Sequence, residues 1–470
     1  MSDIGPAIEA YLTRLWETPV VIRDLARIPG GASRETYRFD AFVDGERRRL
    51  ILRREPASGL IDTESETEFR AYRSAAGVVP VPRAIALEKG GAELERPFFL
   101  MERIDDGVVV GPFDRAGFGN HAEALGEQFF AALGRLAAHD ASASPLAAHL
   151  DAPAPDQCWR IALDYWEKVI DTDAFAPQPI VRAAIRRLRA TPPPPAARIA
   201  LVHGDYRSGN MMHDGAGRML AMFDWEMAHF GDPLEDLGWA LNPVWDHFQP
   251  GRACGMVSPE RALAIWQASS GVVPDPAALD WWRLFNAVKG SAIWTSAFRE
   301  FVTGGRTDPV LGLSGWYVQR RQDAVIAAML SGTPTVPTAR DEAQSDLGHI
   351  LTGTGLTAAG AGMAASAHDA FGGATFTITG VLSLLAAEEA EKAAAWRLAD
   401  IAAMRALLGD EAPREETQEM TLSALDARWA QLAAVLIAHH DRVAAEGGDE
   451  SALLAFYRES AARRELAWPG

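Results

Sequence analysis

The chain has 470 residues, of which 48% are hydrophobic and 23% are charged, and its formal net charge at pH 7 is −18. This length predicts two or three globular domains, and the acidic balance argues against nucleic-acid binding, which needs clustered basic side chains. The acidic N-terminus and the lack of a long apolar run predict neither a signal peptide nor a spanning helix. Two cysteines, Cys158 and Cys254, predict no disulfide framework. We expect a cytoplasmic protein without a membrane partner.

Residues 18–105 predict a small antiparallel sheet that carries one helix. A helix is expected at 6–16, before strands in "VVIRDLARIPGG", "RETYRFDAFVDGERRRLILRRE" and "RPFFLMERI". Asp44 and Gly45 separate two alternating runs, which is a strong hairpin signal. Between the strands, "DTESETEFRAYRSA" is typical of a helix, and "VVPVPR" is typical of an extended segment that ends it.

The remainder of the chain reads as mainly helical. Loops and short strands are expected around "LVHGDYRSGNMM" at 201–212 and "GRMLAMFDWE" at 217–226. The segment "SGTPTVPTAR" at 331–340 is typical of a linker, and the alanine-rich residues after it predict an all-helical appended domain. The expected domains are 1–105, 106–332 and 341–470, with a homodimer through the last as one expectation.

The stretch at 201–212 concentrates polar groups whose spacing indicates chemistry. Asp205 and Asn210 share one loop, and Asp224 ends an apolar strand fourteen residues after Asn210. Amide and carboxylate oxygens suit Mg²⁺, which takes few protein ligands. If Asn210 and Asp224 bind the metal, Asp205 is left to accept a proton from a hydroxyl. Protein-kinase-like catalytic loops divide their work in this way.

The motifs "HGDYRSGN" and "FDWEMAHFGDPLEDLGWAL" resemble those of the aminoglycoside phosphotransferase and choline kinase family. The resemblance covers about 18–330. It implies an α+β, two-lobed protein-kinase-like fold with a small antiparallel-sheet lobe and a mainly helical lobe, to which the C-terminal all-α domain is appended. By this likeness Asp205 is the catalytic base, Asn210 and Asp224 bind Mg²⁺, and His203 and Asp236 support the loop. Glu226 either has a function in the site or faces solvent.

Phosphate-binding groups are expected between two of the predicted strands. Gly30, Gly31 and Ser33 would let backbone amides approach the phosphates of ATP, although a plain hairpin would have the same residues. The resemblance places the hinge that meets adenine at Met101 and Arg103. The sequence does not distinguish ATP from GTP.

The family's lysine on the third strand is absent, because no lysine precedes Lys89. The resemblance places Arg53 in that position, with Arg54 as the alternative, and arginine can grip phosphates through its planar fork. Glu68 on the following helix is the expected partner, and Glu64 is the second choice.

The acceptor is indicated only by the likeness to phosphotransferase domains associated with acyl-CoA dehydrogenases. That likeness implies transfer from ATP to a hydroxyl of a small molecule, such as a hydroxyacyl-CoA or a small alcohol. Arg207 is expected either to steady the phosphoryl group or to pair with an acid. An aminoglycoside or macrolide phosphotransferase and a non-catalytic nucleotide-binding scaffold remain alternatives. The tryptophans between 239 and 316 are expected to be mainly core residues: Trp239, Trp245, Trp266, Trp281, Trp282, Trp294 and Trp316.

Overall fold

A computed structural model of the chain describes residues 4–28, 34–56, 64–91, 94–111, 114–303, 308–336, 345–414 and 419–469. These residues belong to two compact units. The first comprises Met1–Ile161 and Pro193–Arg283, and the second comprises Ala162–Pro192 and Leu284–Gly470. The expected three-part division at residues 105 and 332 stays a prediction.

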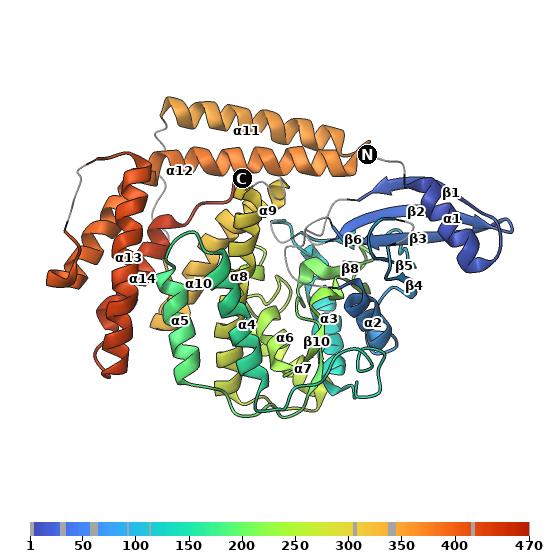
Figure 1. Cartoon of the computed structure of the whole chain (residues 1–470), viewed down its shortest axis with the longest axis horizontal. Coiled ribbons are helices and arrows are strands. Elements are labelled where there is room, and N and C mark those ends of the chain that lie inside the picture. The colour runs from blue at the N-terminus through green and yellow to red at the C-terminus, as the bar shows by residue number, and fades with distance from the viewer. Residues whose placement is uncertain are drawn as a thin grey trace. The chain divides into compact units, whose positions relative to one another are not determined.

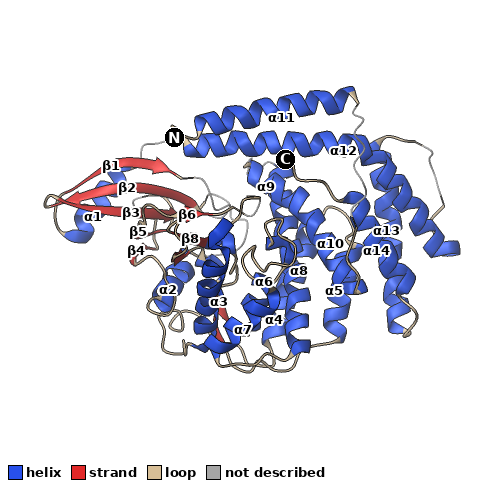
Figure 2. Ribbon diagram, turned by 180° about the vertical axis from the view of Figure 1, so that it is seen from behind, coloured by secondary structure: helices blue, strands red, loops and turns tan. Residues whose placement is uncertain are grey.

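The first unit contains a five-stranded antiparallel sheet in the order β1-β2-β3-β5-β4, drawn in red in Figure 2. Its strands are β1 (Val20–Arg27), β2 (Glu35–Val43), β3 (Glu46–Arg54), β4 (Ala84–Glu88) and β5 (Phe98–Glu102). Two smaller sheets, β6-β8-β9 and β10-β7, lie in the same unit. Their strands are β6 (Val108–Val109), β7 (Ala200–Val202), β8 (Met211–His213), β9 (Met219–Met222) and β10 (His229–Gly231).

The predicted hairpin between β2 and β3 is confirmed. Asp44 has a φ of 50° and Gly45 a φ of 84°. Two successive positive φ angles are typical of the tight turn that matches the twist of paired strands, and Asp and Gly tolerate them best. The turn sets the register in which Val43 pairs with Glu46.

Helices α1 and α2 cover opposite faces of the sheet because side chains alternate along each strand. On β5, Phe98 and Leu100 pack in a core with Ile8 and Leu12 of α1. The intervening Phe99 instead contacts Tyr72 of α2, with ring centroids 6.0 Å apart. Both faces of the sheet are therefore covered at β5, and α2 packs on the face that carries Phe99.

Helices make up most of the remaining structure (Figure 1). Those within the first unit are α1 (Gly5–Trp16), α2 (Ser65–Ala75), α3 (Ala122–Ala138), α6 (Leu234–Ala240) and α7 (Pro259–Ser270). Two helices run from one unit into the other: α4 (Cys158–Asp173) and α8 (Pro276–Thr303). The second unit adds α5 (Pro179–Ala190), α9 (Pro309–Leu313), α10 (Gln319–Ser331), α11 (Asp346–Ala365), α12 (Ala370–Leu408), α13 (Leu422–Ala445) and α14 (Ser451–Arg464). The described part of the appended region is all-helical, as predicted.

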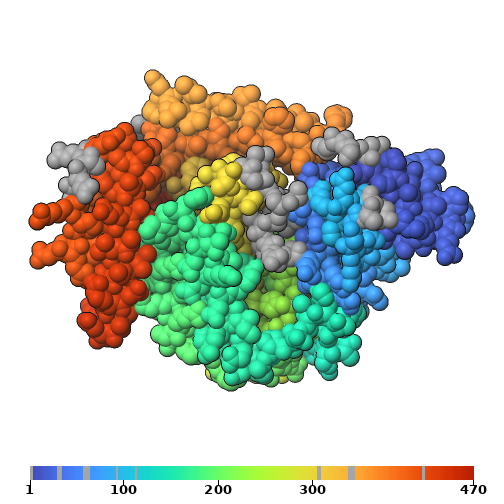
Figure 3. All heavy atoms as spheres, in the orientation of Figure 1, coloured from blue at the N-terminus to red at the C-terminus, as the bar shows by residue number. Residues whose placement is uncertain are grey.

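Glycines allow α11 and α12 to pack as a close antiparallel hairpin, which forms one continuous orange layer in Figure 3. A Cβ atom on Gly362 would lie 2.6 Å from the carbonyl oxygen of Gly373, and one on Gly380 would lie 2.5 Å from that of Gly355. Real Cβ atoms do not approach backbone oxygens so closely. Gly355 and Gly362 lie seven residues apart on α11, as do Gly373 and Gly380 on α12, which keeps the two glycines of each helix on one face.

One described helix, Ala370–Glu411, is long and apolar enough to cross a membrane by length and composition alone, and 22% of its most apolar window is buried. The expectation of no spanning helix rests on the lack of long uninterrupted apolar runs, and this helix meets the criterion of length and composition without such a run. Gly, Ser and Thr interrupt such runs without adding charge. The absence of a membrane partner stays a prediction.

Candidate active site

The loop after β7 is held by Asp236, which lies in the first turns of α6. The carboxylate of Asp236 accepts hydrogen bonds from the backbone N–H groups of His203 (2.6 Å) and Gly204 (2.9 Å). Gly204 has a φ of +85°, and a Cβ there would lie 2.4 Å from the carbonyl oxygen of Met227. Asp236 therefore holds two backbone amides of the loop, and only glycine fits at position 204 beside Met227.

His203 ties this loop to the end of β9. Its Nδ1 accepts a hydrogen bond from the N–H of Asp205 (3.1 Å), so Nε2 carries the proton and donates to the carbonyl oxygen of Phe223 (2.8 Å). Burial lowers the pKa of His203 and favours the neutral ring that this arrangement needs. The side chain of His203 is fully buried, and its role as a support of the loop stays a prediction.

The carboxylate of Asp205 receives hydrogen bonds from three side chains. Trp239 Nε1 donates to Oδ1 (2.7 Å), Asn210 Nδ2 donates to Oδ2 (2.8 Å), and Arg207 Nε lies 3.1 Å from both oxygens. Trp239 was expected only among the core aromatics. Its position three residues after Asp236 places both on one face of α6, which is the signal that could have found it.

Asp224 lies on the segment next to Asn210, because the N–H of Phe223 donates to the carbonyl oxygen of Asn210 (2.8 Å). The backbone of Asp224 is left-handed, with φ 64° and ψ 57°. Its N–H donates to the hydroxyl of Tyr72 (3.0 Å). Strained backbone of this kind persists only where its surroundings hold it, and it is concentrated at functional sites.

Arg53 connects β3, α2 and Asp224 through buried ion pairs. Its Nε lies 2.9 Å from Glu68 Oε1, and its Nη2 lies 2.6 Å from Asp224 Oδ1. Arg34 Nε joins the cluster 3.3 Å from Glu68 Oε2 and was not anticipated from the sequence. Arg53 and Glu68 are thus together, whereas the contact of Arg53 with Asp224 spans 171 residues and has no local sequence signal.

Arg54 and Glu64, the alternatives to Arg53 and Glu68, do not pair with each other. Arg54 pairs with Glu35 at 2.5 Å, and the side chain of Glu64 is 71% exposed. Of the two candidates at each position, Arg53 and Glu68 are therefore the ones that meet.

Charge in the cluster is set by burial and by the ion pairs. Burial alone would lower the pKa of Arg53, but the carboxylates of Glu68 and Asp224 outweigh it and raise that pKa. Burial raises the pKa of Glu226 to about 8, with a further contribution from the carboxylates of Asp224 and Glu68. For Asp224, attraction to Arg53 and Arg207 outweighs burial and lowers the pKa. Glu226 is buried beside the site and does not face solvent.

The remaining nucleotide-site predictions have mixed outcomes. Gly30, Gly31 and Ser33 lie outside the described residues. Met101 is buried on β5, and Arg103 pairs with Asp40 (2.9 Å) and Asp105 (2.7 Å). The side chain of Arg103 is therefore held by carboxylates next to the expected hinge.

The donors present fit a Mg²⁺ site with few protein ligands. No group of three or more His, Cys, Asp or Glu side chains that could hold a metal occurs among the described residues. Asn210 and Asp224, on hydrogen-bonded neighbouring segments, supply hard amide and carboxylate oxygens. Magnesium typically takes one or two such ligands and completes its shell with water and phosphate.

Comparison with known proteins assigns the chain to a family. Residues 24–282 match the model of the phosphotransferase enzyme family. The chain is 25% identical over 327 residues to acyl-CoA dehydrogenase family member 10 of Mus musculus, which covers 66% of this chain and 30% of that protein. It is 30% identical over 169 residues to viomycin phosphotransferase of Streptomyces vinaceus, which covers 32% of this chain and 52% of that protein. The chain thus spans less than a third of the length of the mouse relative.

The fold is similar to that of a crystal structure assigned to an aminoglycoside phosphotransferase of Ralstonia eutropha. The TM-score is 0.54 at 21% identity, and the match covers 69% of this chain and 97% of that chain. The α+β, two-lobed kinase-like architecture with additional C-terminal helices is therefore the fold of this protein.

Proposed function

Because the chain belongs to the phosphotransferase enzyme family, we propose that it transfers the γ-phosphoryl group of Mg-ATP to a hydroxyl of a small molecule. The observation that carries the proposal is the carboxylate of Asp205. Trp239, Asn210 and Arg207 hold it in one orientation beside the segment of Asp224. A carboxylate held in a fixed orientation is what the acceptor hydroxyl needs from a general base.

In this reaction Asp205 orients the acceptor hydroxyl and takes its proton as the hydroxyl oxygen attacks the γ-phosphorus in line, while the bond from the γ-phosphorus to the bridging oxygen breaks and ADP leaves. Arg207 is stacked over the ring of Trp245 at 5.0 Å, which supports its guanidinium beside Asp205. Asn210 and Asp224 would hold Mg²⁺, which supplies positive charge for the phosphate oxygens when bound. Arg53 pairs with the carboxylate of Asp224, and Glu68 pairs with Arg53.

The acceptor that we favour is a hydroxyacyl thioester or a small alcohol. The support is the similarity to acyl-CoA dehydrogenase family member 10, whose name refers to acyl-CoA chemistry. An antibiotic acceptor is the second candidate, because viomycin phosphotransferase has the higher identity over its shorter match. A scaffold that binds nucleotide without transfer is opposed by the hydrogen-bonded Asp205.

A parallel screen separates these candidates. ADP release from Mg-ATP would be measured with hydroxyacyl-CoA thioesters, simple alcohols, aminoglycosides, macrolides and viomycin, with Mg-GTP in a second series and the Asp205→Asn protein as the blank. We expect release above the blank with a thioester or an alcohol. Release with an antibiotic alone would assign the second candidate. Nucleotide binding without transfer to any acceptor would refute the enzyme.

A further inference from the structure

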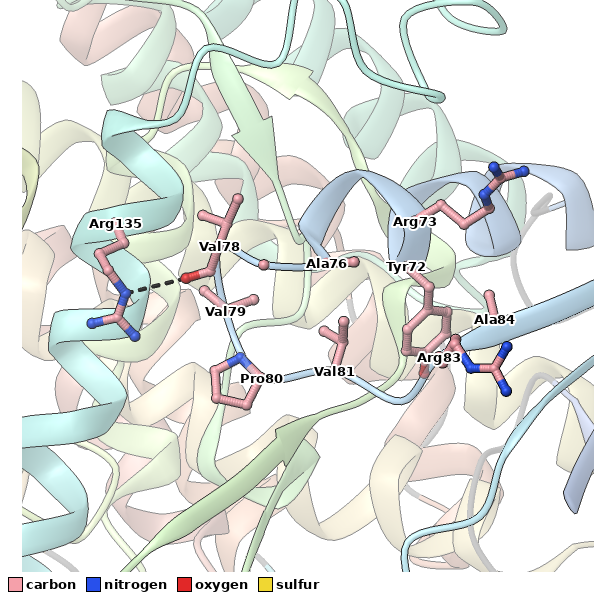
Figure 4. A pocket seen from close by; sticks show the side chains of 11 residues that line it. Tyr72, Arg73, Ala76, Val78, Val79, Pro80, Val81, Arg83, Ala84 and Arg135 are labelled. Carbon is pink, nitrogen blue, oxygen red and sulfur yellow. Dashed lines mark hydrogen bonds between the residues drawn. The ribbon is translucent and has the colours of Figure 1, made fainter. Parts of the chain in front are cut away.

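A hollow of about 700 Å³ lies in the first unit, and Asp205 is not among the residues that line it (Figure 4). The end of α2, the segment 76–84 and α3 surround it. In Figure 4, Arg135 stands on α3 at one side of the segment, and Arg73 and Arg83 stand at the other side. Between them, Val79, Pro80 and Val81 form an apolar floor.

The lining of the hollow combines this floor with positive charge. Three arginines line it, and no carboxylate does. Arg83 pairs with Glu102 at 2.6 Å. In the parts of the chain that the structure describes, no carboxylate forms an ion pair with Arg73 or Arg135. Arg135 donates through Nε to the carbonyl oxygen of Val78 (3.1 Å), which fixes the root of its guanidinium. Two cations beside an apolar floor therefore lack a counter-charge.

We propose that this hollow binds a small amphiphilic anion, with a carboxylate or phosphate head group and an apolar body. Guanidinium groups match both head groups geometrically, through paired N–H donors. The valine and proline surface matches an aliphatic or aromatic body. The volume lies within the range that small-molecule sites occupy.

Two hydrogen bonds connect the floor of the hollow to the strand that leads to Asp224. The carbonyl oxygen of Pro80 accepts from the N–H of Met222 (2.9 Å), and the hydroxyl of Tyr72 accepts from the N–H of Asp224 (3.0 Å). Tyr72 also packs on Trp225, with ring centroids 6.3 Å apart. A ligand resting on Pro80, beside the buried ring of Tyr72, therefore steadies the backbone of Asp224 from behind. This second step rests on the proposed function, and it predicts that the ligand tightens Mg-nucleotide binding.

Binding is tested first on the full chain without nucleotide, by titration calorimetry. The probes are octanoate, octyl phosphate, octanol and inorganic phosphate. We expect octanoate or octyl phosphate to bind at least tenfold more tightly than octanol and inorganic phosphate, and the better of the two identifies the head group. Equal binding of octanol would overturn the proposal, as would the absence of binding by both octyl anions.

Paired variants locate the site. The double variant R73Q/R135Q should weaken binding of the octyl anion at least tenfold. The control R38Q/R261Q removes the same charge at exposed positions outside the hollow and should leave binding unchanged. Equal loss in both variants would indicate attraction by overall charge alone, and would also overturn the proposal.

Coupling is tested by measuring the affinity for a non-hydrolysable Mg-ATP analogue with and without the saturating octyl anion. We expect at least a threefold gain in the wild-type protein and none in Tyr72→Phe, which keeps the ring and loses the hydroxyl acceptor. An unchanged affinity in the wild type would refute the coupling. A protein that binds the octyl anion but no nucleotide would refute the proposed function while leaving the anion site intact.

Discussion

The loops around Asp205 and the α11–α12 hairpin are built on opposite principles. Charged and polar side chains hold the loops: Asp236 binds two backbone amides, His203 bridges two segments, and Arg53 pairs with both Glu68 and Asp224. In the hairpin, glycines lack side chains at the contact and so allow the backbones of the two helices to pack closely. The structure of the loops therefore depends on charged and polar contacts, whereas the structure of the hairpin depends on close packing at its glycines.

Several polar side chains of the hairpin form hydrogen bonds with the backbone of their own helix. Between residues 347 and 387 the only Asp, Glu, Lys or Arg is Asp369, which caps α12 by accepting from the N–H of Gly372 (2.9 Å). Thr354 and Thr357 donate to backbone oxygens four residues earlier, at 2.9 and 2.8 Å. With these hydroxyl groups bonded to the helix backbone, large apolar side chains such as Ile350, Leu356 and Met363 remain exposed on the hairpin. Substitutions that change charge should therefore affect the loops most. Substitutions that add side-chain volume should affect the hairpin most.

The largest expected effect follows from removing the charge at the centre of the loops. Asp205→Asn keeps the shape of the side chain but removes the proton acceptor, so we expect kcat to fall roughly 10²- to 10⁴-fold. Affinity for Mg-ATP should stay within about threefold, because Asp205 faces the acceptor. Turnover and nucleotide binding would be measured on the same preparation. A variant with normal kcat would show that another group is the base.

Acid should weaken the loops more than the hairpin. His247 Nε2 shares a hydrogen bond with the hydroxyl of Ser208 (2.7 Å), and burial lowers the pKa of His247 to about 4. Between pH 6.5 and 4 the unfolded chain binds the proton more readily, so the free energy of unfolding falls as the pH falls. The loss should reach up to about 3 kcal/mol, at ~1.4 kcal/mol per pKa unit.

Urea unfolding at pH 7 and pH 4.5 would measure this loss. We expect His247→Gln to be less sensitive to acid than the wild type, and His368→Gln, at an exposed turn position, to behave as the wild type. The same sensitivity in all three proteins would assign the acid response to other groups.

A larger side chain at a glycine of the contact should destabilise the hairpin, whereas the same side chain at a glycine outside the contact should stabilise it. Gly362→Leu forces a side chain against the backbone of Gly373 and Thr377, so we expect a loss of about 1–3 kcal/mol in unfolding free energy. Gly360→Leu is the matched control, because nothing lies within 4 Å of its Cβ position. There the better helix former should stabilise by up to about 1 kcal/mol. Urea unfolding compares the two, and equal effects would show that the close approach of the helices is unimportant.

The smallest expected effect concerns the orientation of Asp205. Trp239→Phe removes one donor to the carboxylate and should lower kcat about tenfold, since a hydrogen bond to a charged group contributes about 1.5–3 kcal/mol. Trp266→Phe is the control, because that buried indole N–H has no hydrogen-bond partner among the described residues. Its kcat should stay within about twofold. If the two variants lose the same activity, the effect of Trp239 is packing and not orientation.

Local signals in the sequence predicted much of this molecule. The Asp44–Gly45 turn, the N-terminal sheet and the helical tail follow from turn chemistry and apolar periodicity, which act within a few residues. The spacing of His203, Asp205 and Asn210 likewise predicted one loop, and its motif indicated the family.

Tertiary structure alone decided which distant groups meet. It joined Arg53 to Asp224, brought Arg34 to Glu68, placed Trp239 on Asp205, and set the hydroxyl of Tyr72 behind Asp224. It also showed that glycines of α11 and α12 lie where the two helices approach each other, which the composition did not indicate. Such contacts depend on how elements pack across long stretches of chain, and the energy of burying a charge or closing a gap exists only once both partners are in place.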